Sequence, residues 1–264
     1  RKLAGEKGAT RERASSLSFF ERVSTSRAEK KMATIRPFRA LRPPPERAKD
    51  VSCVPYDVVT TEEARMLAGG NPLSFLHVTR ADIDMPDRDA AGTGGGGQRS
   101  PEEPVYRTAL RNFEAMKSAG VLVEEESPCL YAYRLEEGSR AQTGLVCCCS
   151  VEEYDRNVIK KHELTKKDKE DDRFTHMLAI GAHAEPVLIA FKSNRRIKAR
   201  LARAAGGAPL FDFVSEDGVR NTLWRVRDPK PFVKLFERVP ALYIADGHHR
   251  AAAASRLLRH MEGV

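Results

Sequence analysis

The clearest pattern of apolar and polar positions lies near the C-terminal end of the chain. The apolar run 242–245 is followed by Asp246-Gly247 and then by the Ala- and Leu-rich stretch 251–258. A short apolar run rich in β-formers indicates a buried strand, and Asp-Gly is a common tight turn. Because Ala, Leu and Arg favour helix, the pattern predicts a strand, a turn and a helix start in direct succession.

Strand and helix patterns alternate elsewhere without a regular period. Apolar residues at helical spacing predict a helix over 106–119 that ends at Gly120, and the runs 129–134 and 143–150 around a turn at 136–138 predict a β-hairpin. Further strands are expected at 71–80, 186–191, 209–214 and 221–226, and further helices at 160–176, 192–200 and 228–238. Because no βαβ repeat emerges, we predict an α+β fold with a mixed sheet.

Composition narrows the class of protein. The 264 residues are 41% hydrophobic and 31% charged, which is typical of a globular protein, and no segment approaches the ~18 apolar residues of a membrane span. The net charge of +8 favours anionic partners. Adjacent strand residues point to opposite faces, so the run Cys147-Cys148-Cys149 indicates free thiols in a reducing compartment, and we expect a cytoplasmic protein.

Two segments are expected to lie outside the ordered domain. Residues 1–31 are rich in Arg, Lys and Ser and have no sustained apolar face, so we interpret them as a disordered or artefactual extension. An organellar import signal is the alternative, although the Glu residues in this segment are unusual in such signals. The Gly-rich stretch 87–104 is predicted to be a flexible loop and not a P-loop, because it lacks a Gly-Lys-Ser/Thr ending.

The predicted turn after 242–245 has the chemistry of a phosphate site. Free N–H groups and the positive end of the helix dipole would converge beyond Asp246 and Gly247, and His248, His249 and Arg250 would add side-chain donors. An ordinary turn followed by a solvated helix is the alternative. Neighbouring helical residues point about 100° apart, so His248 and His249 do not have the spacing of a shared metal site.

A second block, 160–176, is rich in charged residues and nearly free of apolar ones. As a helix it would bring Glu163 and Arg173 close to one face and set Asp172 and His176 one turn apart. Glu163, Asp171 and Asp172 are candidates to hold Mg²⁺ or to orient an acceptor hydroxyl, while Arg173 and His176 are candidate phosphate ligands. A solvated helix is the alternative interpretation.

Asp57 lies in the segment Val-Pro-Tyr-Asp, just ahead of a predicted helix start. Thr60 and Glu63 have the spacing of a capping box. Asp57 is therefore either a base or metal-facing carboxylate beside the site or a structural turn residue, and the sequence leaves both open.

Five blocks in the same order resemble a large, mostly bacterial family labelled SpoOJ/ParA/ParB/RepB-like. They are IRPFRALRP at 35–43, VPYDVV at 54–59, NPLSFLHVTR at 71–80, the charged block 160–176, and DGHHR at 246–250. The last block also resembles the phosphate-binding turn of the ParB/sulfiredoxin-like superfamily, whose members bind ATP or CTP. Members of the family are generally longer, so residues 32–264 are expected to form one family domain that is incomplete at its C-terminal end.

The resemblance implies a nucleotide-binding protein. The first function that it implies is that of an ATP- or ADP-dependent phosphotransferase with Mg²⁺, which acts on a small hydroxylated metabolite as do the free-serine kinases that share this turn. The alternative function is that of a ParB-like regulatory or DNA-partition-related module without catalysis. The carboxylate-rich block would repel DNA, so DNA is not an expected partner of this chain.

Overall fold

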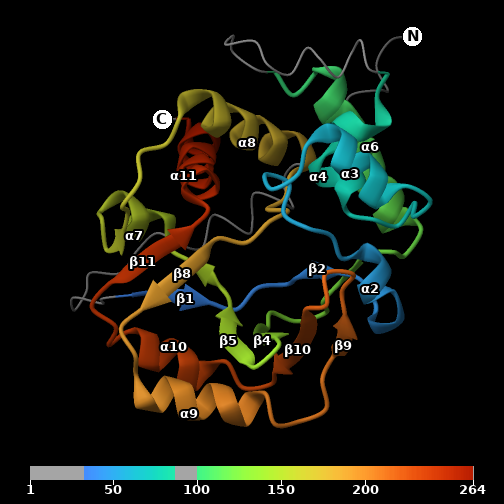
Figure 1. The fold of residues 1–264 in the computed structure, drawn as a ribbon. Coiled ribbons are helices and arrows are strands. Elements are labelled where there is room, and N and C mark those ends of the chain that lie inside the picture. The colour runs from blue at the N-terminus through green and yellow to red at the C-terminus, as the bar shows by residue number, and fades with distance from the viewer. Residues whose placement is uncertain (1–32, 87–99, 264) are drawn as a thin grey trace, which may run out of the picture. The chain divides into compact units, whose positions relative to one another are not determined.

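The computed structural model describes residues 33–86 and 100–263 (Figure 1). Helices and strands intermix along these residues, and one sheet combines parallel with antiparallel pairs, so the fold is α+β as predicted. Residues 1–31 and most of the loop predicted at 87–104 lie outside the described residues. α6 (Pro104–Ser118) begins at Pro104, the last residue of that predicted range, and proline suits the first turn of a helix.

The four-stranded sheet has the antiparallel order β5-β4-β10-β9. Its β4 (Leu130–Glu137) and β5 (Arg140–Val146) form the predicted hairpin, and Gly138 takes a left-handed φ of 56° in the turn between them. β10 (Arg220–Val226) pairs with β4 on one side and with β9 (Phe211–Val214) on the other. The predicted strands at 209–214 and 221–226 are therefore neighbours.

The three-stranded sheet carries the strand that leads to the predicted phosphate turn. β11 (Leu242–Asp246) lies between β7 (Ile159–Lys160), which is parallel to it, and β8 (Leu188–Phe191), which is antiparallel. The strand expected at 186–191 is partly buried on one side only. Leu188 and Ala190 are exposed, because β8 forms the edge of the sheet and only its alternate residues face the core.

The main core lies between this sheet and two helices, α9 (Arg195–Ala204) and α10 (Lys230–Phe236). Ile244 and Leu242 of β11 pack in one cluster with Ile197 of α9 and Phe232 of α10, and each of these four side chains is almost completely buried. The alternation of buried and exposed residues along β11 thus fixes the start of the following helix relative to the core.

The two long helices α8 and α11 pack against each other. α11 (His248–Glu262) lies along α8 (Lys167–Ile180), and Met177, Ala253 and Leu257 form a small apolar cluster between them. α8 also contacts α6, the helix predicted at 106–119. Helix packing therefore brings the second charged block of the sequence beside the predicted phosphate turn.

Two secondary-structure predictions are wrong. Residues 71–80 form a turn and the short helix α4 (Leu76–Thr79), not a strand, because Asn71 and Ser74 side chains accept hydrogen bonds from nearby backbone N–H groups and bend the chain. The helix predicted over 160–176 begins only at Lys167. The N–H group of Lys166 donates instead to His249, which holds residues 161–166 against the start of α11.

The remaining elements are short. They are β1 (Ile35–Arg36), β2 (Leu41–Arg42), η2 (Pro45–Arg47), α2 (Ala48–Val51), α3 (Thr61–Ala68), η3 (Ala81–Asp84), β3 (Val123–Glu124), β6 (Cys148–Cys149) and α7 (Val151–Asp155). α3 begins with the predicted capping box, in which Thr60 and Glu63 exchange hydrogen bonds.

All five cysteines are free thiols. Among the described residues, no helix is both long and apolar enough to span a bilayer.

Candidate functional site

The turn between β11 and α11 presents backbone donors to one point. Gly247 has φ 90° and ψ 35°, and this left-handed conformation lets the strand pass directly into the helix. The first helical hydrogen bond runs from the N–H of Ala251 to the carbonyl of Gly247. The N–H groups of His248, His249 and Arg250 precede it and find no acceptor within the described residues, as expected at the start of a helix. They are available to an anion.

Arg250 folds back beneath this turn. Its Nη2 donates to Asp246 Oδ2 at 2.5 Å, its Nη1 donates to the carbonyl of Pro186, and its side chain is only 9% exposed. These two contacts engage two of the five N–H donors of the guanidinium. The fold-back depends on the absence of a side chain at Gly247, since a Cβ there would lie 2.9 Å from Arg250 Nε.

Gly247→Ala is expected to be more destabilising than the same change at Gly218, which has a similar φ of 83° but open space around it. Both substitutions force alanine into a left-handed conformation, at a cost of about 1–2 kcal/mol. Only Gly247→Ala must also displace the Arg250 guanidinium. Urea unfolding of both variants measures the difference, and equal losses would contradict the tight packing inferred at Gly247.

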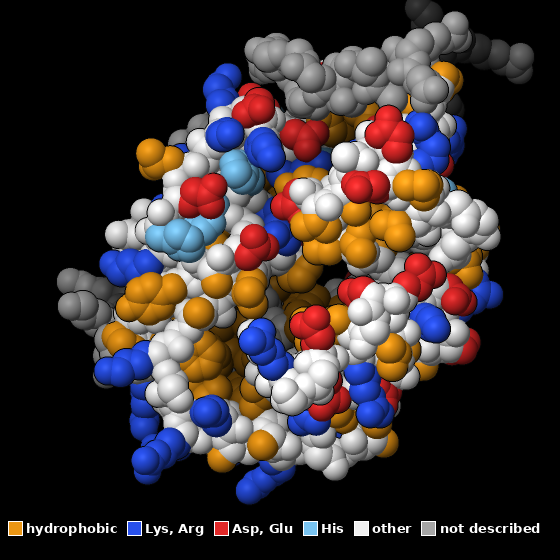
Figure 2. All heavy atoms as spheres, viewed as in Figure 1, with side chains coloured by type: hydrophobic (Ala, Val, Ile, Leu, Met, Phe, Trp, Pro, Cys, Tyr) orange, Lys and Arg blue, Asp and Glu red, His pale blue; other side chains and the backbone are white. Residues whose placement is uncertain are grey.

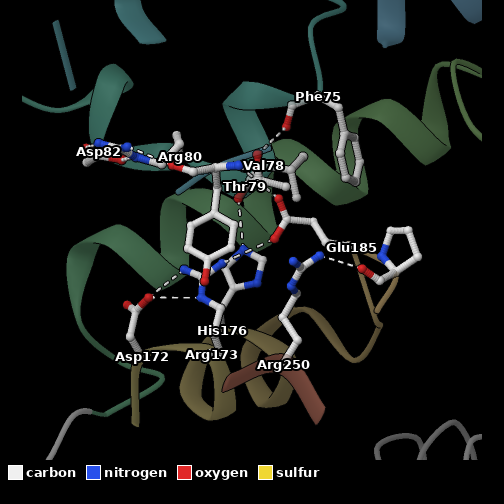
Figure 3. Close-up of polar contacts among 12 residues, drawn as sticks. Phe75, Val78, Thr79, Arg80, Asp82, Asp172, Arg173, His176, Glu185 and Arg250 are labelled. Carbon is white, nitrogen blue, oxygen red and sulfur yellow. Dashed lines mark hydrogen bonds and ion pairs between the residues drawn. The ribbon is translucent and has the colours of Figure 1, made fainter. Parts of the chain in front are cut away.

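A small cavity of about 10 Å³ lies beside the turn, large enough for about one water molecule. Figure 3 shows the side chains that converge on it from α8, from α11 and from the segment that connects α8 to β8. They include Arg173, His176, Glu185 and Arg250. Two guanidinium groups and one carboxylate therefore share a confined space, and one of them, Arg250, belongs to the turn.

Arg173 is held in this space from three directions. Its Nη2 and Nε donate to Asp172 Oδ2 at 2.6 and 3.0 Å, and its Nη1 lies 3.8 Å from Glu185 Oε2. The guanidinium also lies 3.8 Å from the centre of the Tyr56 ring. Burial raises the pKa of Tyr56 to about 12, so the phenol is neutral and its ring can stack on the cation.

Glu185 is a site residue that no sequence pattern indicates. It stands alone between Ala184 and Pro186, where a single carboxylate carries no recognisable spacing. In the fold it accepts a hydrogen bond from the N–H of Tyr56 at 3.1 Å, and burial raises its pKa although the charge of Arg173 opposes the shift. Contacts between distant segments, and not local spacing, bring it to the turn.

Asp57 is exposed and follows directly after Tyr56. Its turn is held by Arg80, which donates through Nη1 to the carbonyls of Tyr56 and Val59 at 3.0 and 2.5 Å. Arg80 also forms an ion pair with Asp82 at 2.9 Å. Arg80 thus braces the turn that carries Asp57.

Residues 161–166 cover the other side of the turn. Glu163 Oε2 lies 3.5 Å from His248 Nδ1, and the ring of His162 packs edge to face on His248 with centroids 4.4 Å apart. His249 Nε2 accepts a hydrogen bond from the N–H of Lys166. His248 is 4% exposed, its Nε2 has no partner within the described residues, and burial lowers its pKa. Glu163 thus reaches the turn from a loop and not from a helix face.

Asp171 and Asp172 lie on α8, where both are engaged by neighbours. Asp171 Oδ1 accepts from Arg256 Nη1, and this hydrogen bond lowers the pKa of Asp171. Asp172 accepts from the hydroxyl of Tyr106 at 2.7 Å and from Arg173. Asp171 therefore joins α8 to α11, and Asp172 joins α6 to the Arg173 side of the cavity.

His176 lies deeper in the same cavity wall. Its Nε2 is 2.9 Å from the carbonyl of Val78, to which it donates, and the side chain is 5% exposed. Burial, reinforced by the positive charge of Arg173, lowers the pKa of His176 to about 4. The imidazole is therefore neutral near pH 7.

The predicted residues thus separate into four groups. Residues 246–250, Arg173 and His176 surround the turn and its cavity, Glu163 lies over the turn from the loop side, and Asp57 lies on the turn that carries Tyr56. Asp171 and Asp172 connect helices. Across residues 33–86 and 100–263, no group of three or more His, Cys, Asp or Glu side chains is arranged to hold a metal ion.

Comparison with known proteins places this chain in a family. Residues 35–263 match the family model described as a protein of unknown function, DUF1015. No curated protein and no solved structure matches the chain. The matched region contains the whole β11 to α11 turn and every side chain of the cavity beside it. The chain therefore belongs to the DUF1015 family.

Proposed function

We propose that the turn 246–250 binds the phosphate groups of ATP or ADP, and that the protein transfers a phosphoryl group to a small hydroxylated metabolite. The observation that carries this proposal is the coincidence of three free N–H groups at the start of α11 with two buried guanidinium groups, Arg250 and Arg173. Backbone donors and the helix dipole favour an anion at this point. Arginine adds bidentate donors of fixed geometry.

The strand, turn and helix of this site support a relationship to the ParB/sulfiredoxin-like phosphate turn, which we include in the proposal. Gly247 supplies the left-handed turn, and the small side chains Ala252 and Ala253 let α11 pack closely on its neighbours. A nucleotide-dependent enzyme of this kind would act in the cytoplasm on a small molecule, with DNA not required as a partner.

Phosphoryl transfer would depend on position and charge more than on covalent chemistry. Glu163 is 58% exposed and lies over the turn, so it is our first choice for a carboxylate that orients the acceptor hydroxyl or contacts Mg²⁺. Asp57 is the second, because it is exposed next to Tyr56. Mg²⁺ would then be held mainly by the nucleotide phosphates, with one protein carboxylate. Asp171 and Asp172 would have supporting roles, since Arg256 and Arg173 already occupy them.

Calorimetry with ATP, ADP and CTP, each with and without Mg²⁺, tests the proposal. We expect binding of ATP or ADP that strengthens with Mg²⁺, and release of a phosphorylated product when small hydroxylated compounds are added. A preference for CTP without phosphoryl transfer would favour the ParB-like regulatory module instead. If none of the three nucleotides binds, residues 246–250 form an ordinary turn and not a nucleotide site.

A further inference from the structure

A second cationic surface lies on the opposite side of the core from the phosphate turn. A groove of about 470 Å³ runs between α9 and α10, and Figure 2 shows Lys and Arg side chains gathered over this part of the molecule. Five cations line it: Arg196, Arg200, Arg203, Lys234 and Arg238. No acidic side chain lines the groove. The surface does not depend on the function proposed above.

The spacing of these cations places them in two rows. Arg196, Arg200 and Arg203 are four and three residues apart on α9, so they lie along one side of that helix. Lys234 and Arg238 are four residues apart, the first within α10 and the second just beyond its end. The rows therefore follow the two edges of the groove.

None of the five cations forms an ion pair with a carboxylate among the described residues. The opposite face of α9 is apolar, and its Ile197 and Leu201 pack into the main core. Like charges at helical spacing repel one another, and these cations make no contribution to the packing of the core. A surface of this kind is stabilised when an anionic partner neutralises it.

The lining of the groove is not only cationic. Ala199, Pro231 and Leu235 line it together with the cations, and none of them is aromatic. Single-stranded nucleic acid that is bound without base-specific contacts is usually held by aromatic rings that stack on bases as well as by cations. Apolar side chains interspersed with cations along a groove instead suit an amphipathic helix laid into it.

We propose that the α9–α10 groove binds an acidic amphipathic helix of a partner protein, whose apolar side chains contact Ala199, Pro231 and Leu235 and whose carboxylates pair with the two rows of cations. Charge complementarity gives the complex its orientation and its association rate. Because α9 has ten residues, a partner helix of about 12 residues, about 18 Å long, would span the groove.

The test uses the full chain and a fluorescein-labelled peptide of about 12 residues, built from Glu and Leu with Leu at helical spacing, monitored by fluorescence anisotropy. A peptide with each Leu replaced by Ser, and an RNA oligonucleotide of similar length, are the comparison probes. We expect the Glu/Leu peptide to bind most tightly. Stronger binding of the RNA, or equal binding of the Ser peptide, would overturn the proposal.

A matched pair of charge reversals locates the binding surface. Arg200→Glu with Arg203→Glu changes the groove, whereas Arg195→Glu with Lys198→Glu changes the net charge equally on the same helix but outside the groove lining. We expect the first double variant to weaken peptide binding about tenfold or more, and the second to weaken it by about twofold or less. Equal effects of the two would show attraction to net charge alone and would also overturn the proposal.

Discussion

Replacing Arg250 by alanine is expected to weaken binding of ATP or ADP by about 1.5–3 kcal/mol, or roughly ten- to a hundredfold in Kd. The guanidinium lies under the free N–H groups of α11 and is held there by Asp246 and Pro186, so charge-assisted bonds to a phosphate would need little reorganisation. Calorimetric titration of the variant with each nucleotide measures the loss.

Arg259→Ala is the matched control, because Arg259 is exposed on the same helix and, among the described residues, its side chain donates only one hydrogen bond, to Ser255 at 3.2 Å. Its affinity for nucleotide is expected to stay at the value of the unaltered chain. Arg250→Lys retains the charge without the planar fork and should have intermediate affinity. If thermal unfolding shows that Arg250→Ala is folded and its affinity is unchanged, the phosphate assignment is wrong.

Acidification is expected to destabilise the protein through His176. The pKa of this imidazole is about 4 in the folded protein, below the ordinary value of 6.5, because of burial and the charge of Arg173. The unfolded chain therefore binds a proton at His176 at a higher pH than the folded protein does. The contribution of neutral His176 to the free energy of unfolding is fully present above about pH 6.5. This contribution, about 3 kcal/mol, is lost as the pH falls towards 4.

Urea unfolding at intervals between pH 7 and pH 4 measures this dependence, and His176→Gln supplies the comparison. Glutamine can still donate to the carbonyl of Val78 but does not titrate. The variant should therefore lose less stability on acidification than the unaltered chain, whatever its stability at pH 7. Parallel curves for the two proteins would show that His176 does not carry the effect.

The candidate site was predictable where it is local in sequence. Residues 246–250 form the expected strand, turn and helix start, because Asp-Gly and the following alanines specify this conformation within a few residues. The hairpin at β4 and β5 and the capping box at Thr60 follow the same local rules. The extent of the helix over 160–176 was not predictable, because the bond between Lys166 and His249 joins residues far apart in the chain.

Carboxylate roles could not be read from composition. Asp171 and Glu163 belong to the same charged block, but Arg256 engages the first in helix packing, whereas the loop places the second at His248. Glu185 gives no local signal, and it joins the cavity only because the segment after α8 returns beneath Tyr56. Which carboxylate faces the turn is thus decided by the packing of α8 on α11.

The sequence alone determined the α+β class, the strand-turn-helix at 242–258 and the excess of positive charge, because these depend on local periodicity, turn chemistry and composition. Only the tertiary structure decided that Arg173, Glu185 and Arg250 share one cavity, that Arg80 braces a turn, and that the cations of α9 meet those of α10 along a groove. These arrangements arise from contacts between segments distant in the chain, whose burial against one core sets which side chains meet.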